Sequence, residues 1–333
     1  MSKHNKVTIR DIAEAVGMSA STVSRVLNRS PLVDPKRAEA VRRVAEELGY
    51  QPGSKRRQAA RTILNIALVL PAGQAGYLHL FYDPAELIRT IQGEFGGTKV
   101  NIVTVTDTGW DDLFTHKKMG TLDACILAFL DPPQELLERL AEWRIPGVLL
   151  NRIHEHVNYV ISDNRGGMQE LVGRVLARRG PSATLCYVDF PQIPQVSKER
   201  RAGFRAGCRE HALSGEQCTE ISVSTLGEID DSFFRRIHEK RIDALLCFND
   251  VIAVYVYQAA LHRRIYIPDD MGLTGFDNSP VRSLVDRSID TMDFRAPELG
   301  AVASHWLQRR IIDRVDTPLR RSITPTYVPG DTL

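Results

Sequence analysis

Residues 7–28 read VTIRDIAEAVGMSASTVSRVLN, and this stretch contains two short helical patterns joined by a tight turn. In both patterns, apolar residues recur at the three-to-four-residue spacing of one helix face, as at Val23 and Val26. Gly17 interrupts the first pattern, where a residue able to adopt positive φ ends a helix. Ser19 follows, and its hydroxyl group can cap the second helix. The stretch therefore predicts a helix-turn-helix.

The outward face of the second helix carries small residues and hydrogen-bonding side chains. Its members are Ala20, Ser21, Thr22, Ser24, Arg25 and Asn28. A helix that lies in the major groove of DNA needs such a face, because bulky side chains would hold it away from the base edges. The alternative is an ordinary helical hairpin on a globular protein, since short patterns of this kind also occur by chance.

The charge distribution favours the DNA-binding interpretation. Residues 1–61 contain 13 Lys and Arg but only 6 Asp and Glu, which gives a formal charge of +7. The whole chain is only +2, so residues 62–333 carry −5. A basic segment followed by an acidic one is typical of a protein that binds a polyanion through one domain.

A third helix completes the predicted head. Asp34 and Pro35 suit the N-cap and first position of a helix that runs to about Leu48 and ends at Gly49. We therefore expect a helix-turn-helix head over residues 1–50. A basic linker follows at 51–62, and an apolar strand pattern begins at Ile63.

The remaining 271 residues alternate between apolar strand patterns and helical patterns. The expected strands are 64–70, 100–106, 124–129, 147–150, 183–188, 244–248 and 272–274. The expected helices are 84–95, 133–143, 165–179, 198–211, 232–240 and 250–263. This alternation predicts an α/β body with parallel sheets covered on both faces. Its length exceeds one ordinary doubly wound unit, so we expect two, with a ligand cleft at their strand carboxyl ends.

Several classes of protein are disfavoured by what the sequence lacks. The N-terminus has no signal-peptide pattern and no apolar run approaches 18 residues, so we expect a cytoplasmic protein without membrane association. The five cysteines have no C-x-x-C spacing, and His154-Glu155-His156 lies in a polar connector. We find no nucleophile, metal or phosphate-loop motif. We therefore expect no metal, no cofactor and no enzymatic activity, although a small-molecule-binding protein or enzyme with a DNA-binding head is the alternative.

Motifs along essentially the whole chain resemble the lac/gal repressor family of bacterial transcription regulators. After the helix-turn-helix stretch they are LGYQP, DACIL, SDNRGG, ERRAGF, FND and GFDN, at residues 48–52, 123–127, 162–167, 199–204, 248–250 and 275–278. The resemblance implies a type I periplasmic-binding-protein-like body of two doubly wound parallel-sheet subdomains. It implies three chain crossings, which we place near Ser162, Ile289 and Arg321. The predicted subdomains are 63–161 with 291–320, and 162–290 with 321–333.

The same resemblance implies a sequence-specific transcription regulator, acting as a repressor, that binds an inverted-repeat operator as a homodimer. It implies that Ser19 caps the recognition helix and that Ala20, Ser21 and Arg25 face base edges. Four other polar residues are better suited to contact phosphates or to support base contacts, namely Thr8, Thr22, Ser24 and Asn28. Lys55, Arg56 and Arg57 are expected to meet phosphates or the minor groove. For Thr8 and Ser19, simple helix capping is the alternative, and the two roles are compatible.

Two departures from the family pattern bear on assembly and on DNA bending. Relatives carry a leucine in the hinge that wedges into the minor groove, and Ala59 takes that place here. Alanine is too short to open a base step, so we expect weak kinking, unless the wedge is shifted to Ile63 or Leu64. The chain ends in TPTYVPGDTL, without leucine heptads, which favours a dimer over a tetramer.

Polar residues after the expected strands match positions where relatives hold a small effector. They are Asn151, Arg200, Asn249 and Asp277, with Phe190 or Phe294 as a surface for a ring to stack on. This set suits a sugar, a polyol or a sugar acid. Asn151 stands where many relatives have aspartate, so an ion pair with Arg200 would be missing there. The alternatives are a core role for each phenylalanine and a loop-capping role for Asp277.

Overall fold

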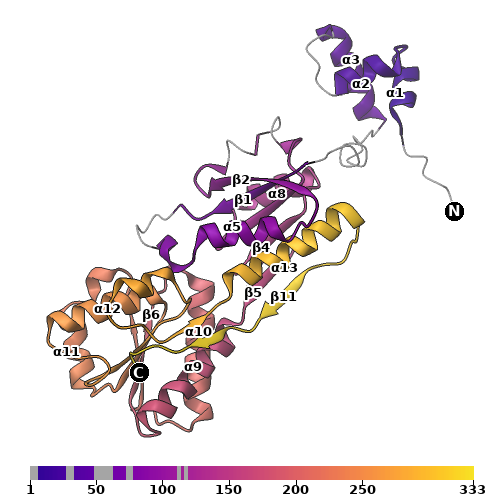
Figure 1. Ribbon diagram of the computed structural model, residues 1–333. Helices are drawn as coiled ribbons and strands as arrows, with labels where there is room; N and C mark the ends of the chain where they lie inside the picture. The colour runs from indigo at the N-terminus through magenta and orange to yellow at the C-terminus, as the bar shows by residue number, and fades with distance from the viewer. Residues whose placement is uncertain (1–6, 28–33, 49–62, 73–77, 111–113, 116–118) are drawn as a thin grey trace. The chain divides into compact units, whose positions relative to one another are not determined.

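A computed structural model describes residues 7–27, 34–48, 63–72, 78–110, 114–115 and 119–333. It divides into two compact units, Met1–Arg61 and Thr62–Leu333, and the division falls within the predicted linker. Figure 1 shows both units and labels many of their helices and strands.

The first unit is the predicted helical head, with α1 (Ile9–Ala15), α2 (Ala20–Leu27) and α3 (Pro35–Glu47). Its core contains Ile12, Val23 and Val41, none of which is exposed. Thr8 and Asp11 form a capping box at the start of α1. The backbone of Gly17 has φ +63°, which explains glycine in the turn between α1 and α2. The predicted helix-turn-helix and third helix are confirmed.

A six-stranded parallel sheet begins the second unit. Its strands are β1 (Ile63–Leu70), β2 (Lys99–Thr106), β3 (Ala124–Ala128), β4 (Gly147–Leu150), β5 (Asn158–Ser162) and β11 (Arg320–Ile323). Their order in the sheet is β11-β5-β4-β3-β1-β2. Helices α5 (Pro84–Gly93) and α13 (Ala296–Gln308) pack on one face, and α8 (Gln134–Glu142) packs on the other. Both faces are covered, so β1 buries Leu64, Ile66 and Leu68 on one face and Ala67 and Val69 on the other.

A four-stranded parallel sheet forms the other part of this unit, in the order β7-β6-β8-β9. Its strands are β6 (Leu185–Asp189), β7 (Cys218–Ser222), β8 (Ala244–Cys247) and β9 (Gly272–Thr274). Helices α9 (Asn164–Arg179) and α10 (Pro194–Glu210) cover one face, and α11 (Asp231–Glu239) and α12 (Asp250–His262) cover the other. The predicted fold class, two doubly wound parallel sheets behind a helical head, is confirmed.

Short segments link the two sheets. Strand β10 (Thr291–Asp293) pairs antiparallel with β12 (Thr326–Val328).

The short helical turns of this unit are η1 (Leu78–Phe81), η2 (Leu226–Glu228), η3 (Pro280–Leu284) and the π-helical η4 (Arg309–Asp313). Strand β11 belongs to the six-stranded sheet, and the subdomain boundary that we expected at 320/321 falls after its first residue. The other subdomain limits are not tested, and all of them stay predictions.

Candidate functional site: a helix-turn-helix head and a buried arginine cluster

Hydroxyl groups gather at the start of α2, the expected recognition helix. The Ser19 Oγ accepts a hydrogen bond from the backbone N–H of Thr22, 3.1 Å away, so Ser19 caps this helix. The same oxygen lies 2.8 Å from the hydroxyl groups of both Ser21 and Thr22. Ser19, Ala20 and Ser21 are exposed, which leaves this end of α2 open to a partner.

The remaining residues expected at DNA divide into those the structure describes and those it does not. Thr8 is exposed, and its hydroxyl group is engaged with Asp11, so it has the capping role that was its alternative. Ser24 is half-buried within α2. The side chain of Arg25 lies outside the described part of the chain, as do Asn28, Lys55, Arg56, Arg57 and Ala59. Their roles stay predictions.

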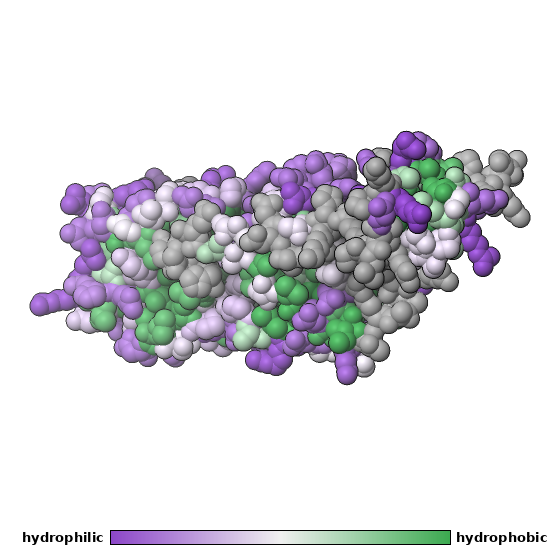
Figure 2. Space-filling model, turned by 90° about the horizontal axis from the view of Figure 1, so that it is seen from above, coloured by the Kyte–Doolittle hydropathy of each residue, from purple (hydrophilic) through white to green (hydrophobic). Residues whose placement is uncertain are grey.

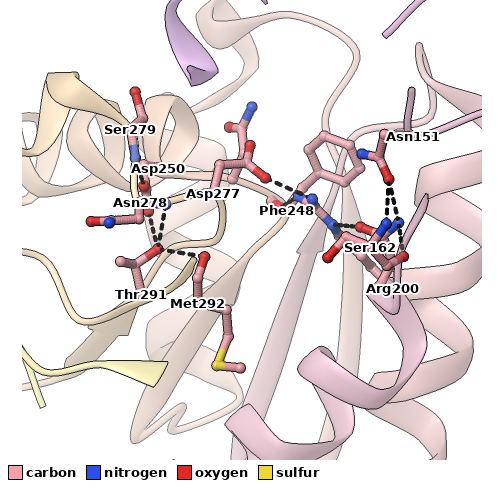
Figure 3. A network of polar contacts seen from close by, with 12 residues as sticks. Asn151, Ser162, Arg200, Phe248, Asp250, Asp277, Asn278, Ser279, Thr291 and Met292 are labelled. Carbon is pink, nitrogen blue, oxygen red and sulfur yellow. Dashed lines mark hydrogen bonds and ion pairs between the residues drawn. The ribbon is translucent and has the colours of Figure 1, made fainter. Parts of the chain in front are cut away.

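In the second unit, Arg200 is the centre of a buried polar cluster, shown in Figure 3. Its side chain is only 2% exposed. Its Nη2 donates to the Asp277 Oδ1 at 2.6 Å, its Nη1 to the Phe248 carbonyl at 2.5 Å, and its Nε to the Asn164 Oδ1 at 3.0 Å. The guanidinium carbon also lies 3.8 Å from the ring centre of Phe276, a cation–π contact. Arg200 thus ties the start of α9 to the ends of β8 and β9.

Asp277 follows β9 in a backbone conformation that L residues rarely adopt, with φ +113°. Its burial raises the pKa of the carboxyl to about 6, while the positive charge of Arg200 acts in the opposite direction. The sequence predicted both residues but not their pairing. They form an ion pair whose two side chains are almost completely buried.

Asn151 lies at the end of β4 and is connected to Arg200 indirectly. Its Oδ1 accepts hydrogen bonds from the Ser162 backbone N–H at 3.2 Å and from the Asn164 Nδ2 at 3.3 Å. Asn164, whose own Oδ1 accepts from Arg200, therefore bridges the two. As expected for asparagine, the charged partner of Arg200 is another residue, Asp277.

The other three predicted residues have structural partners in different places. Asn249 caps α12, with its Oδ1 accepting from the Ile252 N–H at 3.0 Å. The ring of Phe190 packs 5.8 Å from that of Phe248 in the core beneath α11 and α12. The ring of Phe294 lies 5.7 Å from that of Phe129 in the other core.

A cavity of about 640 Å³ lies beside the arginine cluster. Of the six predicted effector residues, Asp277 and Phe294 line it. Tyr82 and Asp83, which immediately precede α5, also line it. The other polar lining residues were not among the predicted effector residues, namely Glu86, Asn278, Ser279, Arg282, Ser283, Ser288 and Asp293. The structure therefore brings only part of the predicted set to one cavity.

Asp250 is a buried carboxyl group that sequence reasoning did not assign. It accepts hydrogen bonds from the Ser279 backbone N–H and from the Thr291 hydroxyl, both at 2.6 Å, and so holds the turn after Asp277 against β10 (Figure 3). Burial raises the pKa of Asp250 to about 8, and the negative charge of Asp277 contributes to the rise. The FND motif contained this residue, but its partners lie some 30 and 40 residues further along the chain.

Comparison with known proteins agrees with this architecture at both ends of the chain. Residues 8–53 match the family model of bacterial regulatory proteins of the lacI family. Residues 175–333 match a periplasmic binding protein-like domain. The chain belongs to the lacI family. With this head and this body, the chain is a DNA-binding transcription regulator, as the sequence resemblance implied.

Relatives and solved structures align over nearly the full length of the regulator. It is 29% identical over 311 residues to the ribose operon repressor of Halalkalibacterium halodurans, covering 91% of this chain and 90% of the relative. It is 24% identical over 340 residues to the HTH-type transcriptional repressor PurR of Pectobacterium carotovorum, covering 96% of this chain and 95% of the relative.

Two solved structures share the fold. One is a complex of the regulator CelR with cellobiose, with a TM-score of 0.66 and 21% identity over 98% of this chain and 99% of that one. The other is the lac repressor dimer bound to operator and an anti-inducer, with a TM-score of 0.64 and 19% identity over the same shares. Among the described residues, no helix is both long and apolar enough to span a bilayer.

Proposed function

We propose that this lacI-family regulator represses transcription by binding an inverted-repeat operator as a homodimer, and that a sugar bound in the body controls it. The observation that carries the proposal is the 640 Å³ cavity beside the buried Arg200–Asp277 pair. Its volume falls in the usual range for a small-molecule site. Its wall offers carboxylate and amide oxygens, which accept hydrogen bonds from sugar hydroxyl groups.

The names of similar proteins support the sugar class. Two are relevant: the ribose operon repressor of H. halodurans and the CelR complex with cellobiose. A lacI-family regulator from Enterococcus faecium was solved with bound ribose and has a TM-score of 0.66 at 16% identity, over 80% of this chain and 98% of that one. Ribose and cellobiose, the two sugars that these names contain, are both neutral.

The control of DNA binding follows from linkage. An effector changes operator affinity only if it binds two conformations of the regulator with different affinity. The arginine cluster is a suitable sensor, because Arg200, Asn164 and Asp277 belong to segments that meet at the strand ends of both sheets. A ligand beside Asp277 would therefore act on the contacts that hold these segments together.

Thermal unfolding of the full chain with a panel of sugars tests this function. A sugar present at 100 times its Kd should stabilise the protein by about 2.7 kcal/mol and raise its Tm by several degrees. The same sugar should then change the affinity for a cognate operator in a gel shift. If a stabilising sugar left operator binding unchanged, control by that sugar would be refuted.

Arg25 in α2 offers a test of sequence-specific binding. We expect Arg25→Ala to weaken binding to the cognate operator by about 1–3 kcal/mol, because a bidentate arginine–guanine contact has that value. Binding to random DNA should fall much less, as measured by fluorescence anisotropy at one fixed salt concentration. Equal losses on both DNAs would show that Arg25 contacts only phosphate.

Exposed apolar residues indicate where two copies would meet. Figure 2 shows hydrophobic residues reaching the surface of the body between hydrophilic ones. Leu80 in η1, Tyr255 in α12 and Leu284 in η3 are 39%, 37% and 69% exposed, and these three elements pack against one another. We propose this surface as the dimer contact, because burying exposed apolar side chains on neighbouring elements would stabilise a dimer.

We expect Leu284→Asp to convert the dimer to a monomer in sedimentation velocity. A carboxylate in the centre of an apolar interface would be desolvated without a partner. Operator affinity should fall at least about tenfold, because a monomer contacts only one half-site. Ile312→Asp is the matched control, since Ile312 is 45% exposed in η4, which lies in a different part of the body. A dimer that survives Leu284→Asp would refute this surface.

A further inference from the structure

We infer that the effector of this regulator is uncharged or positively charged, and that the cavity excludes sugar phosphates and sugar acids. The inference rests on the proposed function, because it assumes that the effector occupies the 640 Å³ cavity. The charged side chains that line the cavity restrict the class of ligand. Four carboxyl groups line the cavity, those of Asp83, Glu86, Asp277 and Asp293, together with one guanidinium, that of Arg282.

Of the five charges, that of Asp277 is compensated by an ion pair. Asp277 pairs with Arg200 at 2.6 Å, so this ion pair contributes little net charge to the cavity. Arg282 is near the buried Asp250, but burial raises the pKa of that carboxyl group to about 8, so it is mostly protonated near neutral pH and does not compensate the guanidinium. Its Nη1 and Nη2 also donate to the Asn278 Oδ1 and the Ser288 Oγ, at 2.5 and 3.0 Å. Arg282 is therefore oriented by the wall itself and does not form an open anion clamp.

Of the three remaining carboxyl groups, those of Asp83 and Asp293 accept hydrogen bonds from neutral donors. Asp83 is the N-cap of α5, and its Oδ1 accepts from the backbone N–H groups of Ala85 and Glu86 at 2.8 and 3.2 Å. Asp293 accepts from the Arg295 backbone N–H at 2.7 Å and from the Asn278 amide at 3.3 Å. Among the described residues, no lysine or arginine side chain forms an ion pair with Asp83, Glu86 or Asp293. These groups give the cavity a net negative potential.

This potential acts differently on ligands of the same shape. Hydroxyl groups donate hydrogen bonds to carboxylates, and an ammonium group donates stronger, charge-assisted ones. A phosphate or carboxylate on the ligand would instead be repelled by these three carboxylates, of which Asp83 and Glu86 are exposed and Asp293 is half-buried. We expect an anionic derivative to bind about 100-fold more weakly than its neutral parent, and an amino derivative to bind at least as tightly.

The test compares ligands that share a sugar ring and differ mainly in charge, using the full-length regulator at constant ionic strength. Thermal shift and then calorimetry would compare D-ribose with D-ribose 5-phosphate, and D-glucose with D-glucosamine, D-glucuronate and D-glucose 6-phosphate. The double variant Asp83→Asn/Glu86→Gln removes two negative charges and keeps a good helix cap. It should narrow the neutral-to-anionic affinity gap at least about tenfold. Glu94→Gln, at the end of the same helix and outside the cavity lining, should leave the gap unchanged.

The outcomes separate this inference from the proposed function. Stabilisation by a neutral or amino sugar, with its phosphate or acid inert and the gap narrowed in the double variant, supports both. A sugar phosphate or sugar acid that binds as tightly as its parent overturns the inference and leaves a sugar-controlled regulator. If the double variant leaves the difference in affinity between neutral and anionic ligands unchanged, the role proposed for these carboxylates is overturned. If no sugar stabilises a protein that still binds its operator, the proposed sugar control fails, and this inference fails with it.

Discussion

Replacing Arg200 with alanine should lower the free energy of unfolding by about 3–5 kcal/mol, because it leaves the Asp277 carboxylate buried without its partner. The Arg200 side chain is 2% exposed and the Asp277 side chain 4% exposed, so water cannot replace the lost contact. The Phe248 carbonyl and the Asn164 amide oxygen lose their donor in the same change. Urea unfolding at pH 8, followed by circular dichroism, would measure the loss.

The pH dependence of this loss identifies its cause. Burial raises the folded-state pKa of Asp277 above its value in the unfolded chain, to about 6, and removal of Arg200 should raise it further. The variant carboxyl is then protonated below pH 6 and no longer carries an unpaired charge. The loss of stability should therefore be smaller at pH 5 than at pH 8.

A double variant provides the matched control. Arg200→Met/Asp277→Asn removes both charges and should recover part of the stability lost in Arg200→Ala at pH 8. A loss that is equal at both pH values, and that the double variant does not reduce, would show that Arg200 acts mainly through packing.

The head could be predicted from sequence almost completely, since its determinants are local. Thr8 and Asp11 cap each other three residues apart, Ser19 caps α2 within its own first turn, and Gly17 ends the preceding helix. Such contacts depend only on spacing along the chain. The strand-helix alternation of the body was equally visible, because central parallel strands such as β3 are buried on both faces.

Strands at or near sheet edges were missed for a physical reason. The half-buried edge strand β7 reads CTEIS, and neither composition nor alternation marks it as a strand. Strands β10 and β12 have three residues each and form by pairing with each other across more than 30 positions. Such strands are stabilised by their tertiary partners, which a local pattern does not contain.

The site shows the same limit. Arg200 and Asp277 could be selected as residue types, but the 77-residue separation of this pair gave no sign that they pair with each other. The cavity wall depends on how the start of α5 faces the turn after β9, so Glu86 and Arg282 had no local signal. For Asn249 and Phe190 the sequence did not distinguish two roles. An asparagine after a strand suits a helix cap as well as a ligand contact, and Asn249 is a cap. A phenylalanine suits the core as well as a stacking surface, and Phe190 lies in the core.

Gly203→Ala should destabilise the regulator by about 3 kcal/mol, at the upper end of the range for overpacked interiors. Gly203 lies in α10 where it crosses α9, and a Cβ there would be 2.3 Å from the Arg165 carbonyl oxygen and 2.9 Å from the Met168 Cβ. Backbone cannot rotate away as a side chain can, so the two helices would have to separate. Arg200 lies one turn earlier in α10, and we expect its contact with Asn164 to lengthen in the same movement.

Gly93→Ala is the matched control for this last change, because Gly93 also lies in a helix but has no atom within 4 Å of the added Cβ. Alanine has the higher helix propensity, so this variant should be neutral or more stable by up to about 1 kcal/mol. Both variants would be compared by urea unfolding, and then by the response of operator binding to the effector. If Gly203→Ala were as stable as Gly93→Ala and kept that response, the close approach of α9 and α10 would not hold Arg200 in place. A loss of both would show that the helix crossing positions the arginine cluster.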